Sequence, residues 1–218
     1  MLEDLTKNPP GNLSTGAYLR LEQMIVMLEL KPGSVITERE LIERVGMGRT
    51  PTREAIQRLS WEGLIEVRPR SGIKIAEIRP DDFVKVTELR AVMEPIFART
   101  ATRFASNWHH SSIAECREMM ERSAASNDLG LFLGADKSFD TILGDASGNV
   151  YLTNCLAPLQ SHGRRFWYRY CSDEGVRQPA DLHMAVMEAF SANDTSGSEK
   201  AMRSLIGHMK ARALELLR

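Results

Sequence analysis

The chain has 218 residues and a formal net charge of −1, with 43% hydrophobic and 26% charged residues. This length allows two small domains or one medium-sized domain, and the nearly neutral charge excludes a general polyanion binder. No segment approaches the ~20 apolar residues of a membrane span, and Met1-Leu2-Glu3-Asp4 lacks the basic and apolar order of a signal peptide. The spacing of Cys116, Cys155 and Cys171 predicts reduced thiols, so we expect a cytoplasmic protein.

Two helical patterns open the chain. The first predicts a helix over residues 16–29, which Lys31-Pro32-Gly33 ends. Thr37 and Glu40 have the spacing of a capping box, which predicts the start of a short second helix that ends at Gly46.

The run GRTPTREAIQRL, residues 48–59, predicts a third helix whose first turn can contact DNA. Thr50 is expected to be its N-cap, with Pro51 at the first helical position. Arg49 and Arg53 then lie where free backbone N–H groups favour phosphate. Such arginines, taken alone, are typical of a solvated helix face. The order helix, turn, arginine-tipped helix instead favours a helix-turn-helix.

A basic hairpin follows the third helix. Residues 63–67 and 73–76 predict two short strands, and residues 68–72 predict the turn between them. These elements together predict a winged helix-turn-helix domain over residues 12–77.

Residues 30–78 resemble the GntR family of bacterial transcriptional regulators. The family pattern SRTPVREAL at the recognition helix is GRTPTREAI here, with Gly48 in place of a hydroxyl residue that often contacts phosphate. The resemblance implies a set of operator-binding residues that includes the wing glycine. These residues are Arg39, Arg49, Thr50, Arg53 and Gly72.

From residue 80 onward the apolar spacing is helical. Pro80, followed by two aspartates, has the composition of a helix start. One helix is predicted over roughly residues 80–105, and further helices are predicted near residues 109–127, 129–146, 149–171, 177–193 and 198–217. Trp108-His109-His110 is expected to lie in the loop before Ser111-Ser112, at the approach to the second of these helices. Six helices joined by short loops predict an all-helical bundle over residues 80–218, so the protein as a whole is mainly α.

Four polar residues fall on helix faces that the pattern predicts to be buried: Asp136, Asp140, His183 and His208. Unpaired buried carboxylates are costly, and a cation can offset that cost. Two carboxylates and two imidazoles suit Zn²⁺, Ni²⁺, Mn²⁺ or Fe²⁺. The alternatives are ordinary core histidines, and aspartates that face solvent or pair with an arginine.

A basic and aromatic stretch, residues 162–170, contains His162, Arg164, Arg165 and Arg169. It fits an anion pocket as well as it fits a helix with one aromatic face and one charged face.

The segment DKSFDTILGDASGN, residues 136–149, resembles the D-x-x-F-H-x-x-L-x-x-A-S-G-N signature of the FCD effector domain, the usual partner domain in FadR-type GntR regulators. Many members bind a divalent metal through one aspartate and three histidines. The resemblance implies that Asp136, Asp140, His183 and His208 form this site, with Asp140 in place of histidine. That departure favours harder ions such as Mn²⁺ or Mg²⁺, or marks a site that has lost its metal.

Two further residues are candidates for effector binding. Arg90 matches the arginine of an R-x-x-x-E pattern in the opening helix of the domain and could anchor a carboxylate, or could pair with Glu94. Asn149 could contact the effector or cap the next helix.

These patterns predict a homodimeric transcription regulator that binds a pseudo-palindromic operator and responds to a small carboxylate. One alternative is a metal-dependent hydrolase that uses the same aspartates and histidines. Another is a regulator whose helical domain serves only dimerisation.

Overall fold

The computed structural model describes residues 13–170 and 175–217, and the chain divides into two compact units after Ile78. This division falls between residues 77 and 80, the two predicted domain limits. The predicted outer limits, residues 12 and 218, and the thiol of Cys171 lie outside the described residues. Within the described part of the chain, no helix is long and apolar enough to cross a membrane.

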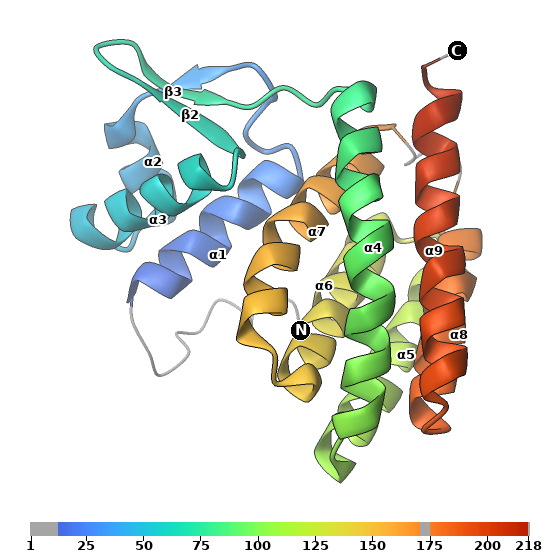
Figure 1. The fold of residues 1–218 in the computed structure, drawn as a ribbon. Coiled ribbons are helices and arrows are strands. Elements are labelled where there is room, and N and C mark those ends of the chain that lie inside the picture. The colour runs from blue at the N-terminus through green and yellow to red at the C-terminus, as the bar shows by residue number, and fades with distance from the viewer. Residues whose placement is uncertain (1–12, 171–174, 218) are drawn as a thin grey trace. The chain divides into compact units, whose positions relative to one another are not determined.

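The N-terminal unit is a winged helix-turn-helix (Figure 1). Its elements are α1 (Leu13–Val26), β1 (Val35–Ile36), α2 (Glu38–Val45), α3 (Arg49–Trp61), β2 (Ile65–Arg68) and β3 (Gly72–Ile75). The strands form an antiparallel sheet in the order β1-β3-β2. Strand β1 is absent from the sequence prediction because two residues are too short to show alternation.

Capping explains where the two helices of the helix-turn-helix begin. Thr37 caps α2 as predicted, accepting a hydrogen bond from the Glu40 backbone N–H at 3.2 Å. The predicted N-cap of α3, Thr50, is wrong. Gly48 is the cap, at a φ of 91°, and as a glycine it has no side chain to form a capping hydrogen bond. Glycine reaches this backbone angle without strain, so the helix starts earlier than the hydroxyl pattern indicates.

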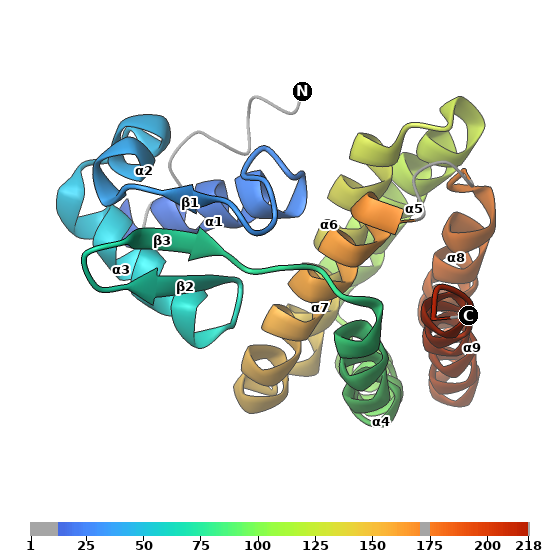
Figure 2. The ribbon, with the colours of Figure 1, turned by 90° about the horizontal axis from the view of Figure 1, so that it is seen from above.

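The C-terminal unit is the predicted helical bundle. Its helices are α4 (Pro80–Phe104), α5 (Asn107–Ser126), α6 (Leu129–Ser147), α7 (Val150–Tyr170), α8 (Arg177–Ser191) and α9 (Thr195–Glu215). Pro80 occupies the first turn of α4, as predicted. Helix α4 packs against α6, α7 and α9, and α8 packs against α5 and α9 (Figure 2).

The predicted loop at Trp108-His109-His110 is wrong, because these residues lie in the first turns of α5. Ser106 caps the helix, and His109 completes a capping box because its Nδ1 accepts a hydrogen bond from the Ser106 backbone N–H at 2.9 Å. The other ring nitrogen of His109 lies 2.9 Å from Asp145 Oδ2 on α6. A histidine in the glutamate position of a capping box gives no standard helix-start pattern.

Gly72 is fixed by the sheet of the wing. Its φ is 98°, and an added Cβ would lie 2.8 Å from the carbonyl oxygen of Ile36 in β1. Residue 72 has no room for a side chain because β3 passes close to β1 at this point. Gly46, at the end of α2, has a φ of 71° but nothing within 4 Å of an added Cβ.

We expect Gly72→Ala to lower the thermal unfolding midpoint more than the matched variant Gly46→Ala. A left-handed backbone costs each alanine roughly 1–2 kcal/mol, and only Gly72→Ala adds the collision with β1. Differential scanning fluorimetry on the full chain measures both. Equal decreases in the unfolding midpoint of the two variants would show that β1 moves away from an added Cβ at no cost in stability.

Candidate functional site

The outward face of α3 carries the predicted DNA-binding residues. Arg49 and Thr50 are the first two residues of the helix, and both are exposed. Arg53 lies one turn on and is also exposed, while Ala55 and Leu59 are buried on the opposite face. Gly48 supplies no side-chain acceptor at the start of α3, so no capping side chain competes with a phosphate for the helix N-terminus beside these guanidinium groups. This arrangement suits a phosphate and a base edge at the same helix end.

Two of the predicted DNA-binding arginines hold exposed ion pairs. Arg39 Nε lies 2.9 Å from Glu43 Oε1, and Arg53 Nε lies 2.7 Å from Glu38 Oε1. Exposed pairs contribute about 0–1 kcal/mol each, so a DNA phosphate can replace these carboxylates at little cost.

The wing adds the basic tip that the sequence predicts at residues 68–72. Arg70 lies in the turn between β2 and β3, at a φ of 65°, and is exposed. Gly72 stands at the start of β3, directly after that turn, with a φ of 98°. Whether Gly72 itself contacts DNA stays a prediction.

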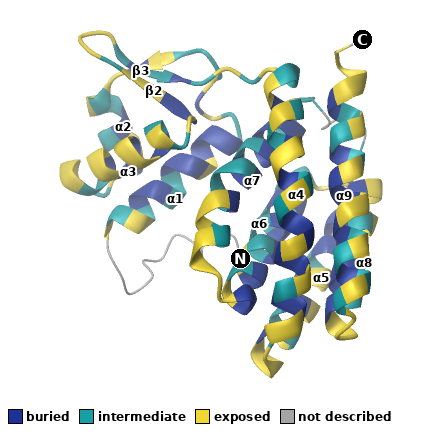
Figure 3. Cartoon of the chain, in the orientation of Figure 1, coloured by how far each residue is buried: buried dark blue, intermediate teal, exposed yellow. Residues whose placement is uncertain are grey.

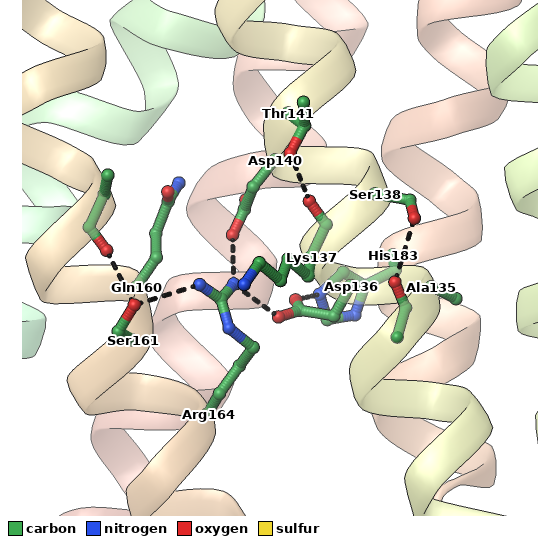
Figure 4. Close-up of polar contacts among 12 residues, drawn as sticks. Ala135, Asp136, Lys137, Ser138, Asp140, Thr141, Gln160, Ser161, Arg164 and His183 are labelled. Carbon is green, nitrogen blue, oxygen red and sulfur yellow. Dashed lines mark hydrogen bonds and ion pairs between the residues drawn. The ribbon is translucent and has the colours of Figure 1, made fainter. Parts of the chain in front are cut away.

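A buried guanidinium organises the polar core of the C-terminal bundle (Figure 4). Arg164, on α7, donates from Nη1 to Asp136 Oδ2 at 3.1 Å and to Asp140 Oδ2 at 2.7 Å, both on α6. Its Nη2 donates to Ser161 Oγ at 3.3 Å. Only 7% of the Arg164 side chain and 11% of each carboxylate side chain are exposed. The two aspartates are therefore paired with an arginine, which was the alternative to a metal.

His183 extends this network to α8. Its Nε2 lies 2.8 Å from Asp136 Oδ1 and its Nδ1 lies 2.7 Å from the carbonyl oxygen of Pro179. A carboxylate and a carbonyl oxygen both accept hydrogen bonds, so this environment favours a proton on each ring nitrogen. Burial lowers the pKa of His183, but the hydrogen bond and charge of Asp136 raise it above its usual value.

The two aspartates shift in opposite directions. Burial raises the pKa of Asp136, but the hydrogen bond from His183 and the charge of Arg164 outweigh burial and hold it well below its usual range. Burial and the adjacent charge of Asp136 raise the pKa of Asp140 to about 7. Asp136 is thus the stable anion of the cluster.

Arg90 pairs with Glu94, one of the two roles that the sequence left open, and carboxylate binding by Arg90 stays a prediction. Its Nε donates to Glu94 Oε1 at 2.7 Å, and both side chains are buried. Arg90 also lines a cavity, where Gly163 on α7 makes room for it because an added Cβ would collide with Arg90 Nη1.

The cavity collects most of the predicted residues. Counted to the open solvent at its mouth, it measures about 350 Å³. Its polar lining consists of Arg90, Asp136, Arg164, His183 and His208, and its apolar lining includes Phe132, Trp167 and Leu205. His208 is half-buried, which lowers its pKa, and its ring lies 5.8 Å from that of Trp167. Asp140 and Asn149 are not among the lining residues.

The side chain of Asn149 caps α7. Its Oδ1 accepts a hydrogen bond from the Leu152 backbone N–H at 3.1 Å, and the residue is exposed. Effector binding by Asn149 therefore has no geometric support.

The four predicted metal ligands do not converge on one point. Among the described residues, no group of three or more histidines, cysteines or acidic residues has the geometry to hold a metal ion. Asp136 and Asp140 face the Arg164 guanidinium, and the His183 nitrogens face Asp136 and Pro179. This arrangement does not fit a divalent metal, and metal binding stays an untested prediction.

Arg164 is the functional residue that the sequence did not single out. It lies in the basic and aromatic stretch noted above, but its partners are 24 and 28 residues away along the chain. The usable signal was charge balance, since two carboxylates on a buried face need a cation from a neighbouring helix.

A winged helix-turn-helix with an arginine-tipped recognition helix, followed by an all-helical domain with a polar cavity, defines a DNA-binding regulator with a separate ligand domain. Residues 13–75 match the family described as bacterial regulatory proteins, gntR family, and residues 85–208 match the FCD domain. The chain belongs to the GntR family of transcription regulators and carries an FCD effector-binding domain.

Known regulators are similar to it over most of its length. The transcriptional repressor RspR of Escherichia coli K12 is 25% identical over 89% of this chain and 86% of RspR. The repressor NanR of Enterobacter sp. 638 is 26% identical over 88% of this chain and 81% of NanR. The structure of E. coli McbR/YncC superposes with a TM-score of 0.81, covering 95% of this chain and 100% of that one, at 18% identity. This last likeness shows the fold.

We expect Arg49→Ala and Arg53→Ala each to weaken operator binding by roughly 1–3 kcal/mol, because each removes a guanidinium from the groove-facing end of α3. Fluorescence anisotropy on a DNA site selected in vitro with the full chain measures the loss. Arg117→Ala, an exposed arginine on α5, is the matched control. Parent-like binding by both α3 variants would refute the assignment of α3 as the recognition helix.

Proposed function

We propose that the protein represses transcription in the cytoplasm and that a small organic acid in the bundle cavity controls its operator binding. The observation that carries this proposal is the pair of buried guanidinium groups, Arg90 and Arg164, at a cavity otherwise lined largely by apolar side chains. The relatives RspR and NanR, both named repressors, support the direction of control.

The donors of Arg90 favour a carboxylate ligand. Among the described residues, Glu94 is its hydrogen-bond partner, and it engages Nε. The remaining N–H groups of a guanidinium match the two oxygens of a carboxylate. His208, half-buried and held neutral by its lowered pKa, supplies a nitrogen that can meet a hydroxyl group. The site therefore suits a hydroxy acid, a sugar acid or a short dicarboxylate.

The size of the cavity favours a small ligand. The space inside it that a water-sized sphere can reach is only about 20 Å³, well below the ~300–1,000 Å³ of ligand pockets, so a ligand must be small and the lining side chains must move to admit it. A long acyl chain does not fit this space.

We expect lactate, gluconate or succinate to raise the melting temperature and to change the affinity for the selected DNA site, since a bound ligand stabilises the folded state. Arg90→Lys should abolish both effects, because lysine keeps the charge but loses the planar fork. Arg99→Lys, on the exposed side of α4, should leave them unchanged. Stabilisation by succinamide or glucose alone, with none by the acids, would argue against this ligand class.

We further propose that the protein is a homodimer whose two copies meet along α4. Leu89, Val92 and Ile96 lie three and four residues apart on one face of that helix and are 55%, 66% and 42% exposed. Exposed positions recur along α4 in Figure 3. Such a stripe suits the same stripe of a second copy packed across a twofold axis. A dimer also supplies two recognition helices, and one half-site gives too little specificity.

Val92→Asp should convert the dimer to a monomer, because it places a charge in the centre of the apolar stripe. Light scattering coupled to size-exclusion chromatography measures the mass. Ala114→Asp, exposed on α5, makes the same change of charge elsewhere and should stay dimeric. If Val92→Asp keeps the mass of two chains, α4 does not form the interface.

The alternatives have distinct outcomes. If no acid shifts the melting temperature while DNA binding and dimerisation persist, the bundle serves only dimerisation. The hydrolase alternative has no support from the relatives, which are transcription regulators.

A further inference from the structure

We propose that the Arg164 guanidinium takes the role of the divalent cation in this FCD domain, so that the cavity binds its anion without a metal. The statement about the anion rests on the proposed function, whereas the statement about the metal does not. The proposal stands on the geometry of α6, α7 and α8 around Arg164.

The first step concerns charge. Asp136 and Asp140 are one helical turn apart on α6, and both are largely buried. A buried carboxylate pair needs a positive charge within hydrogen-bonding distance. Nη1 of Arg164 meets that need for both, at 3.1 and 2.7 Å. The compensating charge is therefore part of the chain itself.

The second step concerns space. A metal held by both carboxylates would have to lie about 2.0–2.2 Å from an oxygen of each. Nη1 of Arg164 already lies between the two Oδ2 atoms (Figure 4). A metal bridging the two Oδ2 atoms would need the space that the guanidinium occupies, and the other oxygen of Asp136 faces His183 Nε2.

The third step concerns His183. A histidine that coordinates a metal turns one ring nitrogen toward the ion. The Nε2 of His183 lies 2.8 Å from Asp136 Oδ1 and its Nδ1 lies 2.7 Å from the carbonyl oxygen of Pro179, so both ring nitrogens face protein atoms.

The fourth step concerns residue 140. The resemblance to the FCD signature places histidine at this position, and here it is Asp140. An aspartate pairs with Arg164, whereas an imidazole beside a guanidinium would leave the arginine with less compensation. Aspartate at residue 140 and arginine at residue 164 thus form one unit that replaces a histidine and a metal.

The first experiment uses the native protein. After dialysis against EDTA, we expect elemental analysis to find far less than one metal ion per chain, and Mn²⁺, Zn²⁺ and Ni²⁺ to leave the melting temperature unchanged. Retention or uptake of about one ion per chain, lost in His183→Ala, would overturn the proposal.

The second experiment tests whether Arg164 is what excludes the metal. Asp140→His alone keeps the guanidinium and should stay free of metal. Asp140→His combined with Arg164→Met removes the guanidinium and should acquire about one Zn²⁺ or Ni²⁺ per chain, with a melting temperature that falls when EDTA is added. Metal uptake by Asp140→His alone, or no uptake by a folded double variant, would contradict the proposal.

Arg164→Ala provides a second, independent variant should the double variant not fold. With both carboxylates uncompensated, its melting temperature should rise when Mn²⁺ or Zn²⁺ is added. Arg164→Lys keeps a cation and should not respond to either ion. An identical response of these two variants would count against the proposal.

The ligand arm separates the two proposals. Stabilisation of the native protein by lactate, gluconate or succinate should persist in EDTA. Stabilisation that requires added metal would overturn the inference and leave the proposed function intact. Failure of every acid, with or without metal, would contradict the proposed function, and the metal measurements would still decide the inference.

Discussion

Charge compensation around Arg164 is the constraint on which the C-terminal domain depends. Removing one partner from a buried ion pair costs roughly 3–5 kcal/mol, so Arg164 and its two aspartates hold α6 and α7 in one arrangement. His183 attaches α8 to the same network through Asp136. Because this network lines the cavity, a ligand that competes for one of its hydrogen bonds changes how the helices are held together.

Arginine serves two different purposes in the two units. On α2 and α3, the arginines are exposed and bind their carboxylate partners weakly, so these arginines can exchange a carboxylate for a DNA phosphate. In the bundle, Arg90 and Arg164 are buried with partners that cannot leave without a replacement anion. The difference in burial thus separates the exposed arginines, which exchange partners freely, from the buried arginines, which would give up a carboxylate only for another anion.

Local chemistry made most of the fold predictable, because Thr37 and Pro80 carry their helix-start signals within a few residues. The prediction failed where the signal is not in the side chain, as with the backbone angle of Gly48. In the site, the polar residues on buried faces identified the cavity. The pairing of Arg164 with Asp136 was beyond prediction, because it joins two helices whose rotation is set by packing.

The partnership of Asp140 and Arg164 constrains how this domain can evolve. A change at either position alone leaves an unbalanced charge in the interior, so an intermediate sequence with only one of the two residues pays a stability penalty. The two substitutions are therefore epistatic, and each is tolerated best once the other is present. Replacing both residues together is therefore expected to cost less stability than the two single replacements added together.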